Sequence, residues 1–295
     1  MEAARDLWTI GRILAWTQGY FIRREIDSPR LSSEILLAHC LGVERLDLYL
    51  HHDRPLDRDE LTAFRRLIER RVDREPVAYI TGSKGFWESE FQVKPGVLIP
   101  RPDTERLVEL SLEALSETAL PNGRVLELGV GSGAVIISLA KTNPELSCFA
   151  SDISLIPLEV AALNAQKELG GSKVSFVAGS WFTPFNSRAK FDLIVSNPPY
   201  VPTGEIRGLQ PEVSLFEPYL ALDGGGDGLA CIRSIMMQAC DYLVPEGILL
   251  METGSDQRER VEEIFRDCPG FSSIEFFDDY AGLNRVVRLG KKDCQ

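Results

Sequence analysis

The first 75 residues carry apolar side chains at helical spacing. Near the end of this region the apolar positions are Leu61, Phe64, Leu67, Ile68 and Val72. This period is that of an amphipathic helix with one buried face. An earlier helix is predicted to begin where Asp27 or Ser28 precedes Pro29 and to end at Gly42, because a polar cap, a first-turn proline and a final glycine are typical helix boundaries. The pattern therefore predicts a small helical domain over residues 1–75.

From about Gly123 the pattern changes to apolar runs that alternate with helix-like stretches. The runs lie at 124–128, 148–151, 174–178, 191–195 and 247–251, and the helix-like stretches lie near 133–142, 155–168 and 228–243. Strands that are apolar throughout and separated by helices predict an α/β fold, in which helices cover both faces of a parallel sheet. Two last strand-like runs, 273–277 and 285–289, are separated by a turn and predict an antiparallel end of the sheet.

A third pattern separates these two regions. Aromatic and β-branched residues around Gly82 and Gly85 predict a β-hairpin between Tyr79 and Val93. We interpret it as a connector over residues 76–100. The sheet domain then occupies residues 101–295.

Composition narrows the class of protein. The chain has 295 residues, of which 44% are hydrophobic and 26% charged, as in ordinary globular proteins. No apolar run reaches the ~18 residues of a membrane span, and the first residues lack the apolar core of a secretion signal. The six cysteines and three histidines show no metal-ligand spacing. We therefore expect reduced thiols in a cytoplasmic protein, with no metal and no membrane contact.

Charge is distributed unevenly along the chain. Residues 1–75 contain 13 Arg, no Lys and 14 acidic residues, which leaves −11 of the total −12 on the remaining residues. A phosphate backbone is bound mainly through Lys and Arg. The acidic sheet domain therefore argues against DNA as a partner.

A glycine-rich turn follows the first predicted strand of the sheet. The run Val125–Leu128 leads into Gly129, Gly131 and Gly133, and a helix follows. Glycines in such a turn let the backbone approach a ligand that a Cβ atom would exclude. Asp152 ends the next strand, where an acidic side chain can accept hydrogen bonds from both hydroxyls of a ribose. The same glycine spacing also fits the dinucleotide fingerprint, so the turn alone does not distinguish the two ligands.

The third and fourth strands end in equally unusual residues. Trp181 follows the third strand and is suited to contact an adenine ring, or to pack in the core. Asn197-Pro198-Pro199-Tyr200 follows the fourth, and its two prolines prevent the strand from continuing. Its carbonyl oxygens, amide oxygen and aromatic ring suit the binding of a planar NH2 group. Ligands of open α/β sheets bind at this edge of the sheet, so all four strand ends predict one site.

With these motifs the sequence resembles the class I S-adenosylmethionine-dependent methyltransferases. More narrowly, it resembles the bacterial enzymes that methylate a glutamine amide of peptide chain release factors. The resemblance covers nearly the whole chain. Besides the Asn-Pro-Pro-Tyr tetrad, it rests on Arg74–Gly82, Leu98–Glu105, Glu212-Val213, Phe216–Pro218, Ala221–Gly225, Asp227–Leu229, Asp279–Gly282 and Arg285.

The resemblance implies a Rossmann-like methyltransferase sheet, S-adenosyl-L-methionine as cofactor and S-adenosyl-L-homocysteine as its product. Class I release factors, methylated in a Gly-Gly-Gln loop, are the implied partners, and the helical domain is our candidate for selecting them. The implied cofactor-binding residues are Glu127, Gly129, Val130, Gly131, Ser132, Gly133, Asp152, Trp181 and Asn197. The implied catalytic residues are Asn197, Pro198 and Tyr200, and Pro199 and Arg101 join them in binding substrate. The family often has an acidic residue at the position of Ser180, where it binds the adenine amino group. A hydroxyl group accepts that hydrogen bond without the help of a charge, so this departure concerns the affinity for the cofactor.

Two other activities and one other class remain as alternatives. A methyltransferase acting on a ribosomal-protein glutamine, or on the adenine amino group of DNA, would share the tetrad. Base flipping out of duplex DNA needs extensive phosphate contacts, which the acidic sheet domain does not favour. An oxidoreductase or a non-catalytic nucleoside-binding protein would leave the tetrad without a role.

Overall fold

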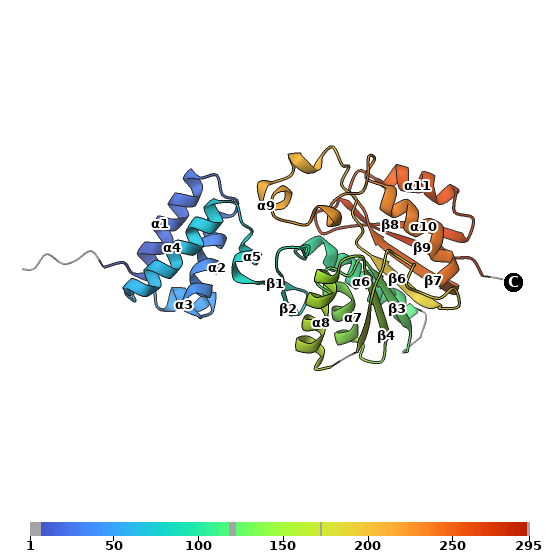
Figure 1. The fold of residues 1–295 in the computed structure, drawn as a ribbon, viewed down its shortest axis with the longest axis horizontal. Coiled ribbons are helices and arrows are strands. Elements are labelled where there is room, and N and C mark those ends of the chain that lie inside the picture. Colours follow the sequence, from blue (N-terminus) through green and yellow to red (C-terminus); the bar gives the residue numbers. More distant parts are fainter. Residues whose placement is uncertain (1–6, 118–121, 172, 294–295) are drawn as a thin grey trace, which may run out of the picture. The chain divides into compact units, whose positions relative to one another are not determined.

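The computed structural model describes residues 7–117, 122–171 and 173–293 (Figure 1). By its internal contacts the chain divides into two compact units. The helical unit comprises residues up to Gly82 together with Gln210–Phe216, and the sheet unit comprises Ser83–Leu209 and Glu217 onward. The domain boundaries expected at residues 75 and 100 stay predictions.

The helical unit is a bundle around one apolar core. Its helices are α1 Ile10–Arg23, α2 Pro29–Leu41, α3 Arg45–Leu50, α4 Arg58–Val72, α5 Val77–Thr81 and the short α9 Pro211–Ser214. Phe21, Leu36, Leu37 and Leu48 are fully buried in this core. Of the apolar positions read from the sequence, Phe64 and Ile68 are buried in the same core, and Leu61, Leu67 and Val72 pack against it.

The segment that carries α9 is held in this unit by charge. Glu212 accepts a hydrogen bond of 2.7 Å from Nη1 of Arg71, and Nη1 of Arg74 lies 3.6 Å from the same carboxylate. The side chain of Arg71 is almost fully buried. A buried guanidinium needs such a partner, because an unpaired charge costs several kcal/mol to bury.

Helix boundaries follow the predicted residues, with one difference. Gly42 ends α2 in a left-handed conformation, as predicted, and Asp57, which the sequence analysis did not name, accepts hydrogen bonds from the first-turn amides of α4. Ser28 precedes α2 as expected, but its side chain makes no capping hydrogen bond. Its φ of 46° is left-handed, whereas a capping side chain needs an extended backbone to reach the first-turn amides.

The hairpin is shorter than predicted. Its strands are β1 Ser83–Phe86 and β2 Ser89–Gln92, which pair antiparallel. Tyr79, which was expected in the hairpin, lies in helix α5 with its side chain buried. Pro76 precedes this helix and Gly82 ends it. A proline before a segment and a glycine after it also mark the two ends of a helix, and this is why the predicted hairpin began too early.

A seven-stranded sheet forms the centre of the second unit. Its strands are β3 Arg124–Leu128, β4 Ser147–Asp152, β5 Val174–Ala178, β6 Phe191–Ser196, β7 Leu243–Glu252, β8 Phe271–Asp278 and β9 Asn284–Lys291. The order is β5-β4-β3-β6-β7-β9-β8. The first five strands are parallel, and β9 pairs antiparallel with both β7 and β8. This confirms the predicted α/β class and its antiparallel end.

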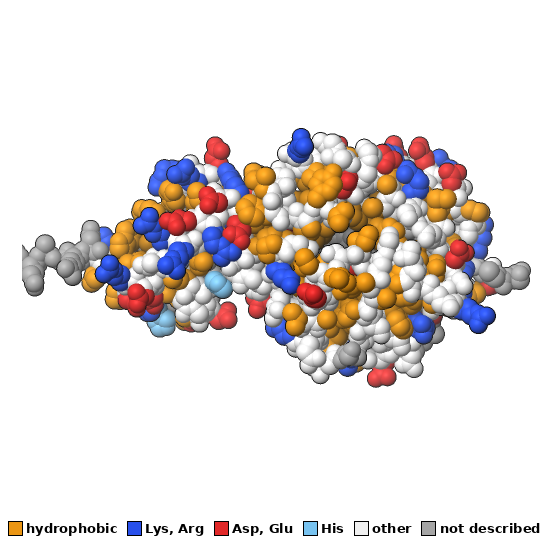
Figure 2. All heavy atoms as spheres, in the orientation of Figure 1, with side chains coloured by type: hydrophobic (Ala, Val, Ile, Leu, Met, Phe, Trp, Pro, Cys, Tyr) orange, Lys and Arg blue, Asp and Glu red, His pale blue; other side chains and the backbone are white. Residues whose placement is uncertain are grey.

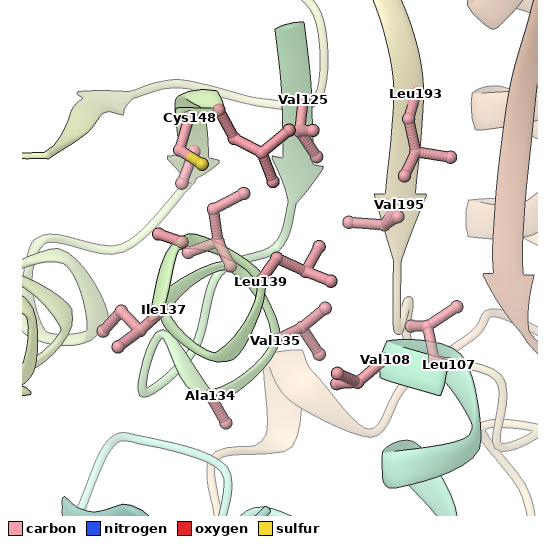
Figure 3. Packing of buried hydrophobic residues seen from close by; sticks show 14 of the residues in the cluster. Leu107, Val108, Val125, Ala134, Val135, Ile137, Leu139, Cys148, Leu193 and Val195 are labelled. Atoms are coloured by element: carbon pink, nitrogen blue, oxygen red, sulfur yellow. The ribbon is translucent and has the colours of Figure 1, made fainter. Parts of the chain in front are cut away.

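Helices cover both faces of the sheet. One face packs on α6 Glu105–Glu117, α7 Ala134–Thr142 and α8 Leu155–Leu169, and the other packs on α10 Ala230–Tyr242 and α11 Arg258–Arg266. The pleat sends Val125 to the first face and Leu126 to the second. Figure 3 shows the first face, where Val195 of β6 points toward helix α7, which carries Val135 and Leu139.

The remaining elements are short. The 3-10 turns are Pro102–Thr104, Ile206–Gly208 and Tyr219–Ala221. Among the described residues, no helix combines the length and the apolar character that crossing a lipid bilayer requires.

Candidate active site

A cavity of about 320 Å³ opens where the parallel strands β3, β4, β5 and β6 end. Its wall includes the predicted residues Gly129, Gly131, Asp152, Trp181, Asn197 and Pro199. It also includes Leu98, Pro218 and Leu220, which were not among the predicted site residues. The volume is within the usual range for small-molecule sites. Four strand ends therefore contribute to one cavity, as the pattern predicted.

The glycine-rich turn serves both the cavity and the core. Gly129, Gly131 and Gly133 have φ values of 74°, 55° and 83°, which disfavour any side chain. Gly129 and Gly131 line the cavity. A Cβ atom on Gly133 would instead meet Ile137 at 2.6 Å and Ala161 at 3.2 Å. The first two glycines are thus placed for a ligand, and the third lets two helices pack closely.

Asp152 is held in place by backbone amides. Its Oδ2 accepts a hydrogen bond of 3.1 Å from the N–H of Gly131, and its Oδ1 accepts one of 2.9 Å from Ser154. Burial raises the pKa of Asp152, and these backbone donors partly oppose the effect. The glycine turn and the carboxylate therefore form one rigid unit at the cavity wall.

Glu127 does not line the cavity in this structure. Its side chain is 3% exposed, and its Oε2 accepts a hydrogen bond of 2.9 Å from the N–H of Ile136 in the first turn of α7. Burial raises the pKa of Glu127 well above its usual value. The contact gives this carboxylate a capping role, and its binding of cofactor stays a prediction. Val130, Ser132 and Gly133 likewise lie outside the lining.

Trp181 closes one side of the cavity. It adopts a left-handed φ of 47°, and its ring passes 3.6 Å from the position of a Cβ atom on Gly129. Its carbonyl oxygen accepts a hydrogen bond of 3.2 Å from Ser151 Oγ. Ser180 lines the same part of the cavity, so a hydroxyl is present where the family often has a carboxylate.

The tetrad lies at the end of β6 and is bonded to its neighbours. Asn197 donates from Nδ2 to Thr104 Oγ1 at 3.1 Å, and among the described residues no donor reaches its Oδ1. The hydroxyl of Tyr200 donates to Oε1 of Glu252 at 3.0 Å. Burial, followed by the nearby Glu252 carboxylate, raises the pKa of Tyr200 far above its usual range. Tyr200 is therefore a neutral phenol, and Asn197 keeps a free amide oxygen at the cavity.

Two buried residues behind the tetrad were missed in the sequence reading. Thr104 is 5% exposed and donates to Oε2 of Glu252 at 2.7 Å, and Glu252 is 1% exposed. One signal for Glu252 was present, because it directly follows the apolar run 247–251. Asp152 follows its own strand in the same way. Thr104 lies in the segment Leu98–Glu105 that carries the family resemblance, but no pattern singled out its hydroxyl.

A third missed residue braces the backbone after the tetrad. Gln257 is buried, and its Nε2 donates to the carbonyl oxygens of Tyr200 at 2.8 Å and Gly228 at 3.2 Å. Its Oε1 accepts a hydrogen bond of 2.9 Å from Gly254. The side-chain amide thereby joins three loops that surround the tetrad.

Arg101 is placed by a buried carboxylate. Its Nη2 lies 2.6 Å from Oε1 of Glu217, whose Oε2 accepts a hydrogen bond of 3.1 Å from the N–H of Ile99. The neighbours Leu98 and Pro218 line the cavity, whereas Arg101 does not. The ion pair therefore joins two segments of the cavity wall. Substrate binding by Arg101 stays a prediction.

Comparison with known proteins agrees with this geometry. Residues 12–82 match the family model described as PrmC N-terminal domain, and residues 103–209 match that of the Methyltransferase small domain. The release factor glutamine methyltransferase of Geobacter sulfurreducens is 42% identical over 98% of this chain and 100% of its own length. The chain belongs to the release factor glutamine methyltransferase family. The Neisseria gonorrhoeae member is also 42% identical, over 89% of this chain and 93% of its own.

Membership of the release factor glutamine methyltransferase family confirms the resemblance and the enzyme class read from the motifs. It does not favour the DNA or ribosomal-protein alternatives. Among solved structures, the catalytic domain of hMettl16 bound to a MAT2A 3'UTR hairpin aligns with a TM-score of 0.53 and 15% identity, over 70% of this chain and 76% of that one. That likeness concerns the fold alone.

Proposed function

We propose that this protein transfers a methyl group from S-adenosyl-L-methionine to the side-chain amide nitrogen of a glutamine in a peptide chain release factor. The observation that carries the proposal is the position of Asn197. Asn197 lines the cavity together with the glycine turn and Asp152, and its amide oxygen accepts no hydrogen bond from the residues that the structure describes. Family membership supplies the reaction class and the release factor.

The residues of the cavity suit the cofactor. Asp152 can accept hydrogen bonds from the two ribose hydroxyls, since each of its oxygens keeps acceptor capacity beyond its backbone contact. Gly129 and Gly131 leave room beside it for a ligand, and Trp181 offers an aromatic surface for a base. When bound, the sulfonium supplies an electrophilic methyl group and takes up the electron pair of the broken carbon–sulfur bond.

Positioning is the main task of the tetrad. A carboxamide nitrogen is a poor nucleophile because its lone pair is delocalised into the carbonyl group. We assign the Asn197 side-chain oxygen and the Pro198 carbonyl oxygen to accept one N–H each from the substrate amide, which aims the nitrogen at the methyl carbon. Alignment of this kind lowers barriers by up to about 7–11 kcal/mol in favourable cases. The two oxygens also stabilise the positive charge that develops on nitrogen.

Tyr200 contributes a surface rather than a proton. Its raised pKa keeps it neutral, and its hydroxyl is engaged with Glu252. Pro199 lines the cavity and Tyr200 follows it directly in the chain, and we assign the two rings to pack against the flat amide. No base is needed before transfer, because the methylated amide is acidic enough to lose its extra proton to water.

Partner selection is assigned to the helical unit. Figure 2 shows basic and acidic side chains lying among apolar ones over helices α1 to α4. The exposed apolar residues there include Trp16, Ile22, Leu46 and Leu50. Scattered exposed apolar residues are ordinary, but a mixed basic and apolar surface suits docking of another protein. The proposal places the protein in the cytoplasm with class I release factors, whose Gly-Gly-Gln loop supplies the glutamine.

The proposal is tested by incubating the full chain with radiolabelled S-adenosyl-L-methionine and a class I release factor. We expect label on the factor and, by peptide mass spectrometry, one added methyl group on the glutamine of the Gly-Gly-Gln loop. A factor with alanine in place of that glutamine is the matched control. Label on duplex DNA or ribosomal protein, but not on the factor, would reject the proposal.

A further inference from the structure

Asn197 is connected to a buried carboxylate through one hydroxyl group. Thr104 Oγ1 donates to Glu252 Oε2 at 2.7 Å and accepts from Asn197 Nδ2 at 3.1 Å. Thr104 and Glu252 are 5% and 1% exposed, so bulk water does not compete for these bonds. The three side chains form a chain of hydrogen bonds that ends at the cavity.

The direction of this chain is set by chemistry. An ionised carboxylate can only accept, so the single proton of the Thr104 hydroxyl must point to Glu252. The hydroxyl oxygen then has only lone pairs to offer to Asn197. Of the two ends of the Asn197 amide, only the NH2 group can use them. The amide oxygen is therefore turned away from Thr104.

A hydroxyl group donates to each oxygen of Glu252, Thr104 to Oε2 and Tyr200 to Oε1, which is the pattern expected of an ionised carboxylate. Burial raises the pKa of Glu252, and these hydrogen bonds and the nearby charge of Arg285 limit that rise. Nε and Nη2 of Arg285 also lie 3.2 Å from the carboxylate of Asp279. A cation is thus fixed near Glu252 and favours its charged form.

We propose that Glu252 and Thr104 are positioning residues, which select the orientation of the Asn197 amide that presents its oxygen to the substrate. This inference rests on the proposed function. The two orientations of an asparagine amide have nearly the same shape, so packing alone does not distinguish them. The reversed orientation presents an NH2 group to the substrate NH2, and two donors cannot bond to each other.

The fold brings these residues together from three places. Strands β6 and β7 are adjacent, and Ser196 pairs with Met251, so Asn197 and Glu252 are the next residues on neighbouring strands. Thr104 comes from the turn Pro102–Thr104 that precedes α6. Glu252 also accepts from the Tyr200 hydroxyl, so one carboxylate holds two members of the tetrad.

The test compares Thr104→Val, which has the shape of threonine without its hydroxyl, with Thr104→Ser, which keeps the hydroxyl. We expect Thr104→Val to lower kcat for release-factor methylation about tenfold or more, the scale of losing an aligned acceptor. Calorimetric titration should give an unchanged cofactor Kd. Thr104→Ser keeps the hydroxyl, so its kcat should stay within about threefold of that of the unchanged protein.

The matched control is Thr142→Val. Thr142 belongs to the same unit but is exposed, and its hydroxyl bonds only the carbonyl of Ser138 within α7, so this variant is expected to keep full activity. Full kcat in Thr104→Val, or a Thr104→Ser variant as impaired as Thr104→Val, overturns the positioning role. Thermal unfolding of each variant shows whether loss of fold accounts for a lower rate.

A second measurement does not depend on turnover. The side-chain NH2 signals of Asn197 in a nitrogen-15 NMR spectrum are assigned through their loss in Asn197→Ala. We expect these NH2 protons to exchange slowly with solvent in the unchanged protein. In Thr104→Val they should exchange at least about tenfold faster, as expected for a lost buried hydrogen bond. Equal exchange rates overturn the inference. If the unchanged protein methylates no release factor, the proposed function fails, and the exchange rates still decide the orientation of Asn197.

Discussion

Replacing Gly228 with alanine places a methyl group against the backbone that carries the tetrad. Gly228 has a φ of 74°, and a Cβ atom there would lie 2.6 Å from the carbonyl oxygen of Tyr200. The same atom would lie 2.9 Å from Nε2 of Gln257, the side chain that braces this carbonyl. Alanine at this position therefore displaces the Tyr200 backbone or its support.

The expected magnitude has two parts. A left-handed conformation costs a residue with a side chain about 1–2 kcal/mol. The 2.6 Å contact must open to at least 3.0 Å before it resembles real Cβ contacts, and crowding of this kind in a packed region costs about 1–3 kcal/mol more. Displacement of a positioning group by a fraction of an ångström also lowers kcat, by about 10–100-fold on the scale of known misplacements.

Gly282→Ala separates these two parts. Gly282 has a φ of 77°, but a Cβ atom there would meet nothing within 4 Å. Both variants should lose the conformational part of the stability in urea unfolding, and only Gly228→Ala should lose more. Only Gly228→Ala should lower kcat, measured with a release factor at saturating cofactor. Equal activity in the two variants would refute the link between Gly228 and the position of Tyr200.

Three further changes test other parts of the structure. Asn197→Ala should lower kcat about 10²–10³-fold, as loss of a transition-state contact does, with cofactor Kd unchanged in calorimetry; full activity would reject the assigned mechanism. Asp152→Ala should weaken cofactor binding about 10–100-fold, because hydrogen bonds to a charged group contribute about 1.5–3 kcal/mol each; unchanged calorimetric affinity would contradict this. Burial would raise the pKa of Glu34, but hydrogen bonds from Tyr49, Arg45 and Arg30 outweigh burial and lower it from 4.5 to about 2. Glu34→Gln should therefore cost up to about 3 kcal/mol in urea unfolding above pH 4.5, and the difference should vanish as pH falls towards 2; a difference independent of pH would exclude the ion pairs as its cause.

Much of the fold could be predicted from the sequence because it depends on properties of neighbouring residues. Strands β3 and β6 are buried at nearly every position because both faces of the sheet are covered, and the consecutive apolar residues that this requires, such as Leu193 to Val195, are visible in a single run of the sequence. The glycine turn and the two prolines of the tetrad are equally local, since they restrict the backbone wherever they occur. The position of the site followed from these features, because the carboxyl ends of parallel strands share one edge.

Other features depended on contacts between distant residues. Thr104 is 93 residues from Asn197 and 148 from Glu252, and although it lies in a segment that carries the family resemblance, the sequence does not show which groups its hydroxyl bonds. Gln257 likewise takes its role from a carbonyl 57 residues away. Ser28 has the residue type of a helix cap, but its backbone conformation prevents the capping bond.

The sequence by itself determined which backbone segments end at the cavity and which of them can approach a ligand. The tertiary structure alone decided which side chains stand behind the tetrad and in which direction their hydrogen bonds run. The physical reason is that backbone restriction is a property of one residue and its neighbours. A hydrogen bond between side chains, by contrast, exists only once folding has placed donor and acceptor about 3 Å apart and excluded water from between them.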